Sequence, residues 1–177
     1  MSKLSFNKFI SLFLLLILLT IIKRWFDYSY AFLWLGAIFG FYLPFVDHLF
    51  YAYIVRPDLE VSGNIKALMR PKTIGRLISF VNETKDQRER LIIHTAYFQV
   101  VFLLLTLYVL TSSGNLLGRG LVYGFSFSLF VEELILFRKT GELKSWFSQI
   151  PILLDHHETK VYIYANVLVL LIFTLML

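Results

Sequence analysis

The sequence predicts an all-α integral membrane protein, a polytopic bundle of about five transmembrane helices that forms a single domain over residues 1–177. The first observation is composition: of 177 residues, 58% are hydrophobic and only 16% are charged, whereas soluble domains carry about 25% charged residues. The second is a mean hydropathy of +0.69. The third is that apolar residues gather in stretches close to the roughly 20 residues that cross a bilayer core. A soluble globular enzyme and a disordered tail are excluded, and the absence of cysteine excludes disulfides and thiolate metal sites.

We expect the transmembrane helices at about residues 9–25, 28–55, 91–110, 118–137 and 161–177. The first stretch has an alternative, because Lys3 and Lys8 followed by a short apolar run (residues 9–22) resemble the n- and h-regions of a signal peptide. No small-residue cleavage site follows this run, and Trp25 suits the membrane interface. We therefore favour an uncleaved spanning helix.

The distribution of Lys and Arg predicts the orientation, because cytoplasmic loops carry an excess of these residues. With five spans and the N-terminus in the cytoplasm, all 17 Lys and Arg except Lys23, Arg24 and Arg119 fall on the cytoplasmic side. The C-terminus is then outside, and the predicted location is the inner, cytoplasmic membrane. This topology explains the net charge of +5, so no nucleic-acid partner is expected.

The cytoplasmic loop of residues 56–90 contains a predicted amphipathic helix at about residues 71–83. Pro71 suits its first turn, and Lys72 and Arg76 suit its polar surroundings. We expect this helix to lie on the inner leaflet, attracted by anionic membrane lipid. The alternatives are that it covers the cytoplasmic end of the bundle, and that the loop binds a protein partner. Its apolar residues follow the spacing of one helical face: Ile74, Leu77, Ile78 and Val81.

Ionisable side chains within the predicted spans are the candidate functional residues. A charge inside the bilayer costs about 2.5–3.5 kcal/mol on insertion scales and usually faces a cavity or a partner. His94 is expected one turn inside its helix. Pro44 should leave the carbonyl of Gly40 unpaired and kink the second span, which would turn Asp47 inward. The candidates all fall in the cytoplasmic half: Asp47, His48, His94, Glu132 and Glu133.

Small residues repeat every four positions on two spans, as at interfaces between membrane helices. The stripes are Gly36, Gly40, Pro44 and His48, and Gly120, Gly124, Ser128 and Glu132. We therefore expect His48, His94 and Glu132 to converge on one point, with Glu133 about 100° round its helix. Imidazole and carboxylate together suit zinc, manganese or iron. A pair that only holds helices together, without chemistry, is the alternative.

Other polar residues carry weaker signals. A lone tripeptide precedes the last span: Asp155, His156 and His157. It could supply a metal ligand from the cytoplasmic side, but the interpretation as a solvated loop is favoured. Thr95 and Gln99 are expected to form hydrogen bonds between helices. The sequence has no glycine-rich phosphate loop, no His-Glu-x-x-His and no Gly-x-Ser-x-Gly.

Three elements in residues 36–147 resemble the inner-membrane metal-dependent hydrolase family, the group with LexA-binding members. Its Gly-x-x-x-Pro-Asp-x-Asp-His element resembles residues 40–48, with Phe45 in place of the first Asp. Its His-Arg-x-x-Thr-His-Ser element resembles residues 89–95, where Glu89 replaces the first His and Thr95 the Ser. Its third element, a His and an Asp four apart followed by Thr-Pro-x-Gly and an aromatic pair, resembles residues 128–147. The residues in those last positions are Ser128, Glu132, Thr140, Gly141, Trp146 and Phe147.

The resemblance implies a membrane-embedded, metal-dependent hydrolase with its site at the cytoplasmic leaflet and a phosphoester or lipid-like substrate. A divalent metal, zinc or manganese, would lower the pKa of a bound water toward neutrality, with Glu133 or Glu89 as candidate general base. The implied metal ligands are Asp47, His48, His94 and Glu132. Because one Asp and two His of the family pattern are absent, the alternative is a non-catalytic membrane scaffold whose buried polar cluster fixes helix packing. A proton- or ion-conducting subunit is disfavoured, since the outer half of the bundle has no polar pathway.

Overall fold

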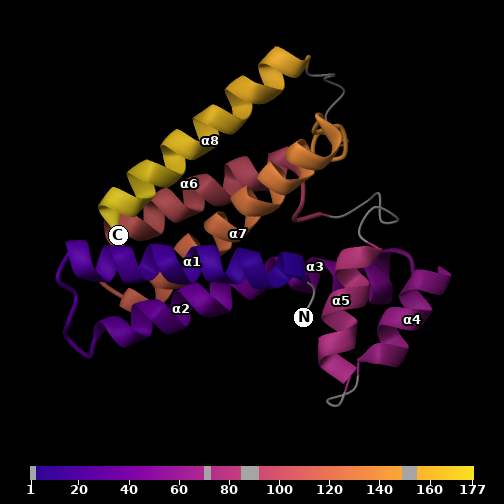
Figure 1. The fold of residues 1–177 in the computed structure, drawn as a ribbon, viewed down its shortest axis with the longest axis horizontal. Coiled ribbons are helices and arrows are strands. Elements are labelled where there is room, and N and C mark those ends of the chain that lie inside the picture. The colour runs from indigo at the N-terminus through magenta and orange to yellow at the C-terminus, as the bar shows by residue number, and fades with distance from the viewer. Residues whose placement is uncertain (1–2, 70–72, 85–91, 149–154) are drawn as a thin grey trace.

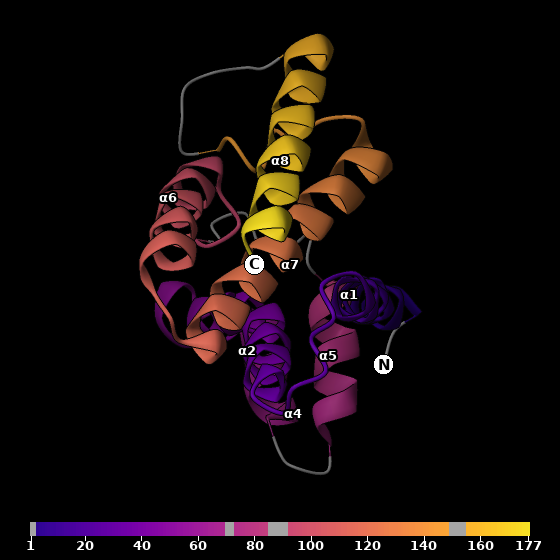
Figure 2. The same cartoon turned by 90° about the vertical axis from the view of Figure 1, so that its left-hand side faces the viewer.

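The computed structural model describes residues 3–69, 73–84, 92–148 and 155–177, and within these ranges it is helical with no strand (Figure 1). The all-α prediction is confirmed. The elements are α1 (Lys3–Ile22), α2 (Tyr30–Tyr42), α3 (Pro44–Phe50), the π-helix η1 (Tyr51–Val55), α4 (Glu60–Leu68), α5 (Ile74–Glu83), α6 (Ala96–Ser112), α7 (Leu116–Thr140) and α8 (His156–Met176). Helix α7 packs against α1, α2, α6 and α8, and so holds the bundle together (Figures 1 and 2). The C-terminus and the α4–α5 pair lie at opposite ends of the molecule (Figure 1).

Among the residues that the structure describes, three helices are long and apolar enough to cross a membrane. They are Tyr30–Val55 with 26 residues, which runs through α2, α3 and η1, Leu116–Thr140 with 25, and His156–Met176 with 21. The two other predicted spans correspond to shorter apolar helices, Asn7–Ile22 and Ala96–Ser112.

Apolar faces without a protein neighbour run along several of these helices. On α8 the large side chains at intervals of three and four residues are 56–77% exposed, and on α6 the equivalent side chains are 53–67% exposed. Such spacing puts each set on one helical face, and an exposed apolar surface of this extent marks contact with a membrane or a partner. The residues are Tyr164, Leu168, Leu171 and Leu175 on α8, and Tyr97, Val101, Leu104 and Tyr108 on α6.

The two glycine stripes form the interface between α2 and α7, as predicted. A Cβ atom built on Gly36 or Gly40 would collide with the backbone oxygen of a residue on α7. A Cβ atom on Gly120 or Gly124 would likewise collide with a backbone oxygen on α2. The backbones of the two helices are therefore in direct contact, which small residues permit. The oxygens concerned belong to Leu117, Leu121, Leu33 and Ala37.

The break at Pro44 differs from the expectation. Helix α2 ends at Tyr42 and α3 begins at Pro44. The carbonyl of Gly40 is not left unpaired, because it accepts a hydrogen bond of 3.1 Å from the backbone N–H of Leu43. The chain tightens into a 3₁₀-type turn here, and α3 then carries Asp47 with its side chain buried.

Two helix starts also differ from the expectation. Helix α6 begins at Ala96, because Thr95 is extended (φ −126°, ψ 149°) and its side chain caps the helix by accepting from the N–H of Phe98. His94 therefore precedes the helix and does not lie one turn inside it. Helix α8 begins at His156, where Asp155 forms a capping box with Glu158.

The segment that follows η1 forms two helices where one was expected. Helix α5 occupies most of the predicted amphipathic helix, and α4 precedes it. Pro71 and Lys72 lie outside the described residues. Buried Ile65 of α4 packs with Leu77 and Val81 of α5 and with Ala52 of η1. This small core attaches the α4–α5 pair to the end of the second span.

Candidate functional site

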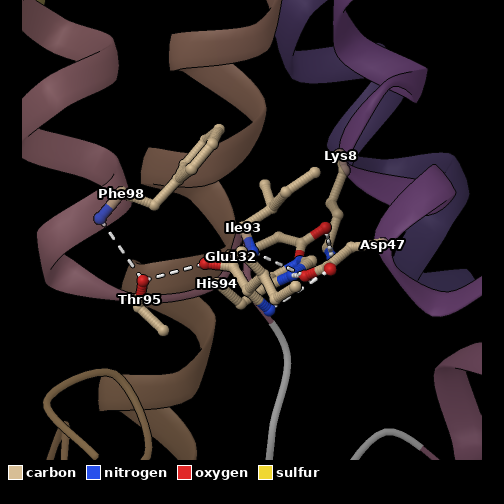
Figure 3. A network of polar contacts seen from close by, with 8 residues as sticks. Lys8, Asp47, Ile93, His94, Thr95, Phe98 and Glu132 are labelled. Carbon is tan, nitrogen blue, oxygen red and sulfur yellow. Dashed lines mark hydrogen bonds and ion pairs between the residues drawn. The ribbon is translucent and has the colours of Figure 1, made fainter. Parts of the chain in front are cut away.

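The candidate site is a line of four polar side chains centred on His94 (Figure 3). The Nδ1 atom of His94 lies 2.9 Å from Oδ2 of Asp47, and its Nε2 atom lies 2.7 Å from Oε2 of Glu132. The other carboxylate oxygen of Glu132 lies 3.5 Å from Nζ of Lys8. Helices α1, α3 and α7 and the segment before α6 thus each contribute one side chain to this Lys8–Glu132–His94–Asp47 network.

Backbone hydrogen bonds hold His94 in place. The carboxylate of Asp47 accepts from the N–H groups of Ile92 (3.2 Å) and Ile93 (2.8 Å) as well as facing the imidazole. Asp47 therefore satisfies backbone donors that the late start of α6 leaves outside the helix. These hydrogen bonds also fix the position of residues 92–94 relative to α3.

The network is buried, and the protonation form of His94 sets its net charge. Lys8, Asp47 and His94 are each at most 9% exposed. Both ring nitrogens of His94 can donate at once only in the imidazolium form. In that form two carboxylates face an imidazolium and an ammonium, so that the network carries no net charge. This balance matters because an uncompensated charge in a dry interior is costly.

His48 lies beside this network. It is 4% exposed, and its ring centre is 5.0 Å from that of His94. The donor types would suit a divalent metal, but each ring nitrogen of His94 already faces a carboxylate and Lys8 stands next to Glu132. In the part of the chain that the structure describes, no group of three or more His, Cys, Asp or Glu side chains could hold a metal ion. The arrangement present therefore fits a charge-balanced network, and a metal would require Lys8 to leave Glu132.

Glu133 points away from this network into a second buried cluster. Its Oε2 atom accepts from Gln99 (2.8 Å) and from Asn166 (3.1 Å). The amide oxygen of Gln99 in turn accepts from the indole N–H of Trp146 (2.6 Å) and the hydroxyl of Tyr162 (2.9 Å). Gln99 thus links helices as predicted, whereas Thr95 caps its own helix. Adjacent glutamates on α7 serve different neighbours because they are about 100° apart round the helix.

The remaining candidates lie elsewhere. Glu89 is outside the described residues. Asp155 caps α8, and His156 stacks on Phe137 with ring centres 5.7 Å apart. His157 is exposed. None of these three belongs to the network of His94.

Sequence reasoning missed two kinds of residue. Lys8 was treated as a flanking cation, although a lysine at the start of an apolar helix can also point inward to a carboxylate. Asn166 and Tyr162 were not singled out, and Trp146 entered only through the family resemblance, although an Asn in the middle of an apolar run was a usable signal.

No family model, no curated protein and no solved structure matches this chain. The resemblance to the metal-dependent hydrolases stays a prediction.

Proposed function

We propose that this chain is a non-catalytic scaffold of the cytoplasmic membrane, with five spans, the N-terminus inside and the C-terminus outside. The shorter helices α1 and α6 would complete the five spans. The positions of Lys and Arg support the orientation, and the exposed apolar faces of α6 and α8 support contact with lipid on both. Membrane lipid, and a protein partner at loop 56–90, are the proposed partners.

The observation that carries the scaffold role is the Lys8–Glu132–His94–Asp47 network. Buried ion pairs add little net stability, but they can specify one arrangement of helices over others. This network ties three helices to the segment that follows loop 56–90. It would therefore fix how α4 and α5 are presented at the cytoplasmic surface.

The experiment is Lys8→Met in purified protein, with Lys144→Met as the matched control. Removing one partner of a buried pair costs up to about 3–5 kcal/mol, and in Lys8→Met the two buried carboxylates, Asp47 and Glu132, would share the single His94. Lys144 faces Glu142 at 2.7 Å, but both side chains are more than half exposed, so its loss should cost under about 1 kcal/mol. Equal unfolding free energies for the two variants would contradict the scaffold role.

A metal-dependent hydrolase is the second candidate, with a phosphoester or lipid-like substrate. The observation in its favour is that Asp47 orients His94 through one ring nitrogen while Glu132 faces the other, since metal-binding histidines are commonly oriented by a carboxylate. Zinc or manganese would activate water, held by Asp47, His48, His94 and Glu132 after Lys8 moves away. The roles of Glu133 and Glu89 as general base are part of this candidate.

Metal analysis separates the two candidates. A scaffold purifies without stoichiometric metal, and Lys8→Met only destabilises it. A metal enzyme purifies with zinc or manganese that a chelator removes, and it keeps or gains metal in Lys8→Met. In that case His94→Ala loses the metal while the helices persist.

A further inference from the structure

Two basic side chains, those of Lys23 and Arg119, bind the last turn of α8 at the end of the bundle opposite α4 and α5. The ammonium of Lys23, just after α1, donates a hydrogen bond of 2.8 Å to the carbonyl of Leu175. The guanidinium of Arg119, in the first turns of α7, donates through Nη2 to the carbonyl of Met176. The ends of α1 and α8 lie together there (Figure 1). Carbonyls at a helix C-terminus attract cations, so the last turn of α8 gathers both.

The positive charge at this point is only partly compensated. Within the described residues, neither Lys23 nor Arg119 forms an ion pair with an acidic side chain, and the buried Nε–H of Arg119 has no hydrogen-bond partner. Lys23 and Arg119 donate to the carbonyls of two consecutive residues, Leu175 and Met176. The two cations are thus close enough to repel each other. An anion between them would relieve this repulsion and could accept from the free Nε–H.

The turn after α1 supports such a site. Arg24 has φ +55°, a left-handed conformation that residues other than glycine rarely adopt. This turn stacks Trp25 on Tyr30 with ring centres 5.0 Å apart, and it leaves Lys23 5.3 Å from the centre of the Trp25 ring. Trp, Tyr and basic residues gather at the level of the lipid headgroups. The surrounding chemistry is therefore that of the membrane interface.

We propose that Lys23 and Arg119 bind the phosphate of an anionic lipid in the outer leaflet. The phosphate oxygens accept from the Lys23 ammonium and from the Arg119 guanidinium, including its Nε–H. Trp25 and Tyr30 line the interface beside the headgroup. The leaflet rests on the orientation given under Proposed function, but the binding itself does not depend on the network of His94.

The test is a titration of the purified full chain, in neutral detergent, with phosphatidylglycerol. Bound lipid is counted by native mass spectrometry and stabilisation is followed by thermal unfolding. Lys23→Gln and Arg119→Gln should each weaken binding about tenfold, since each removes a charge-assisted hydrogen bond. Lys144→Gln, at the other end of the bundle, is the control and should bind as the unmodified chain does.

Arg119→Lys guards against loss of folding in Arg119→Gln, because it keeps the charge and removes Nε; it should bind more weakly than the unmodified chain. Unchanged binding in Lys23→Gln, or equal weakening in Lys144→Gln, would overturn the site. Stabilisation by inorganic phosphate alone, equal to that by phosphatidylglycerol, would overturn the lipid as its ligand. Labelling that places Gly114 in the cytoplasm would refute the leaflet and the proposed orientation while leaving the lipid titration valid.

Discussion

Replacing Gly124 with alanine tests the contact on which the rest of the structure depends. The added Cβ atom would collide with the backbone oxygen, carbonyl carbon and Cα of Ala37 on α2. Each of these is a backbone atom, so no side chain can rotate out of the way. The helices must separate, or α2 must shift along α7.

The expected magnitude follows from two opposing terms. Overpacking of a tight interface costs about 1–3 kcal/mol, and sometimes more, and here the obstacle is rigid backbone. Alanine recovers about 1 kcal/mol relative to glycine in a helix interior. Gly118 on the same helix supplies the control, because the nearest atoms to a Cβ there are side-chain carbons of Asn115 at 4.0 Å. Gly118→Ala should therefore be neutral or stabilising, and Gly124→Ala should be about 1–3 kcal/mol less stable than it, because the gain from alanine is common to both variants.

The assay is reversible unfolding of both variants in mixed micelles, followed by circular dichroism at increasing denaturing detergent. The two free energies are compared with each other as well as with the unmodified chain, which cancels the effect of the micelle. Equal stability of the two variants would refute the close contact of α2 and α7. The position of Asp47, which α3 carries directly after α2, would then also be in doubt.

Three further predictions concern topology, the second cluster and the start of α8. Because the chain has no cysteine, single Gly114→Cys and Lys144→Cys variants can be labelled in intact cells with an impermeant maleimide, and only the first should react before permeabilisation. Gln99→Leu should lower the unfolding free energy by about 1–3 kcal/mol for each buried donor or acceptor it strands, the indole of Trp146 among them. Stability within about 0.5 kcal/mol of the unmodified chain, as for a neutral substitution, would contradict the contact. Asp155→Ala should cost about 1 kcal/mol through loss of the cap without changing metal content, whereas loss of a bound metal would instead favour the tripeptide as a ligand.

The sequence predicted the packing of the site better than its boundaries. Glycines four residues apart can be read directly as close helix contacts, and they led from α2 to His48 and from α7 to Glu132, whereas the side chain that bonds to His94 from α3 is that of Asp47. The start of α6 was misjudged because the apolar run is continuous through Ile92 and Ile93. Thr95, a residue type favoured as an N-cap, was the available signal for the later start.

The partners of each carboxylate could not be predicted in the same way. Glu132 and Glu133 are adjacent and have the same chemistry; the glycine stripe assigns Glu132 to a helix interface, but nothing in the sequence says which residues meet Glu133. Their neighbours depend on which helices lie on either side of α7, and that depends on the whole bundle. Lys8 has the same difficulty, since a long flexible side chain can turn toward the interface or toward a carboxylate.

The separation of these two glutamates explains why α7 can carry both without repulsion between them dominating. Glu132 faces the ammonium of Lys8 and the imidazole of His94, so the positive charge of Lys8 compensates its negative charge. Glu133 meets the amides of Gln99 and Asn166, so its oxygens are compensated by neutral donors. The first arrangement draws α1 and the segment before α6 onto α7, and the second draws α6 and α8 onto it. One pair of neighbouring residues therefore fixes the four elements that surround the C-terminal half of α7, while glycines fix α2 further along the same helix.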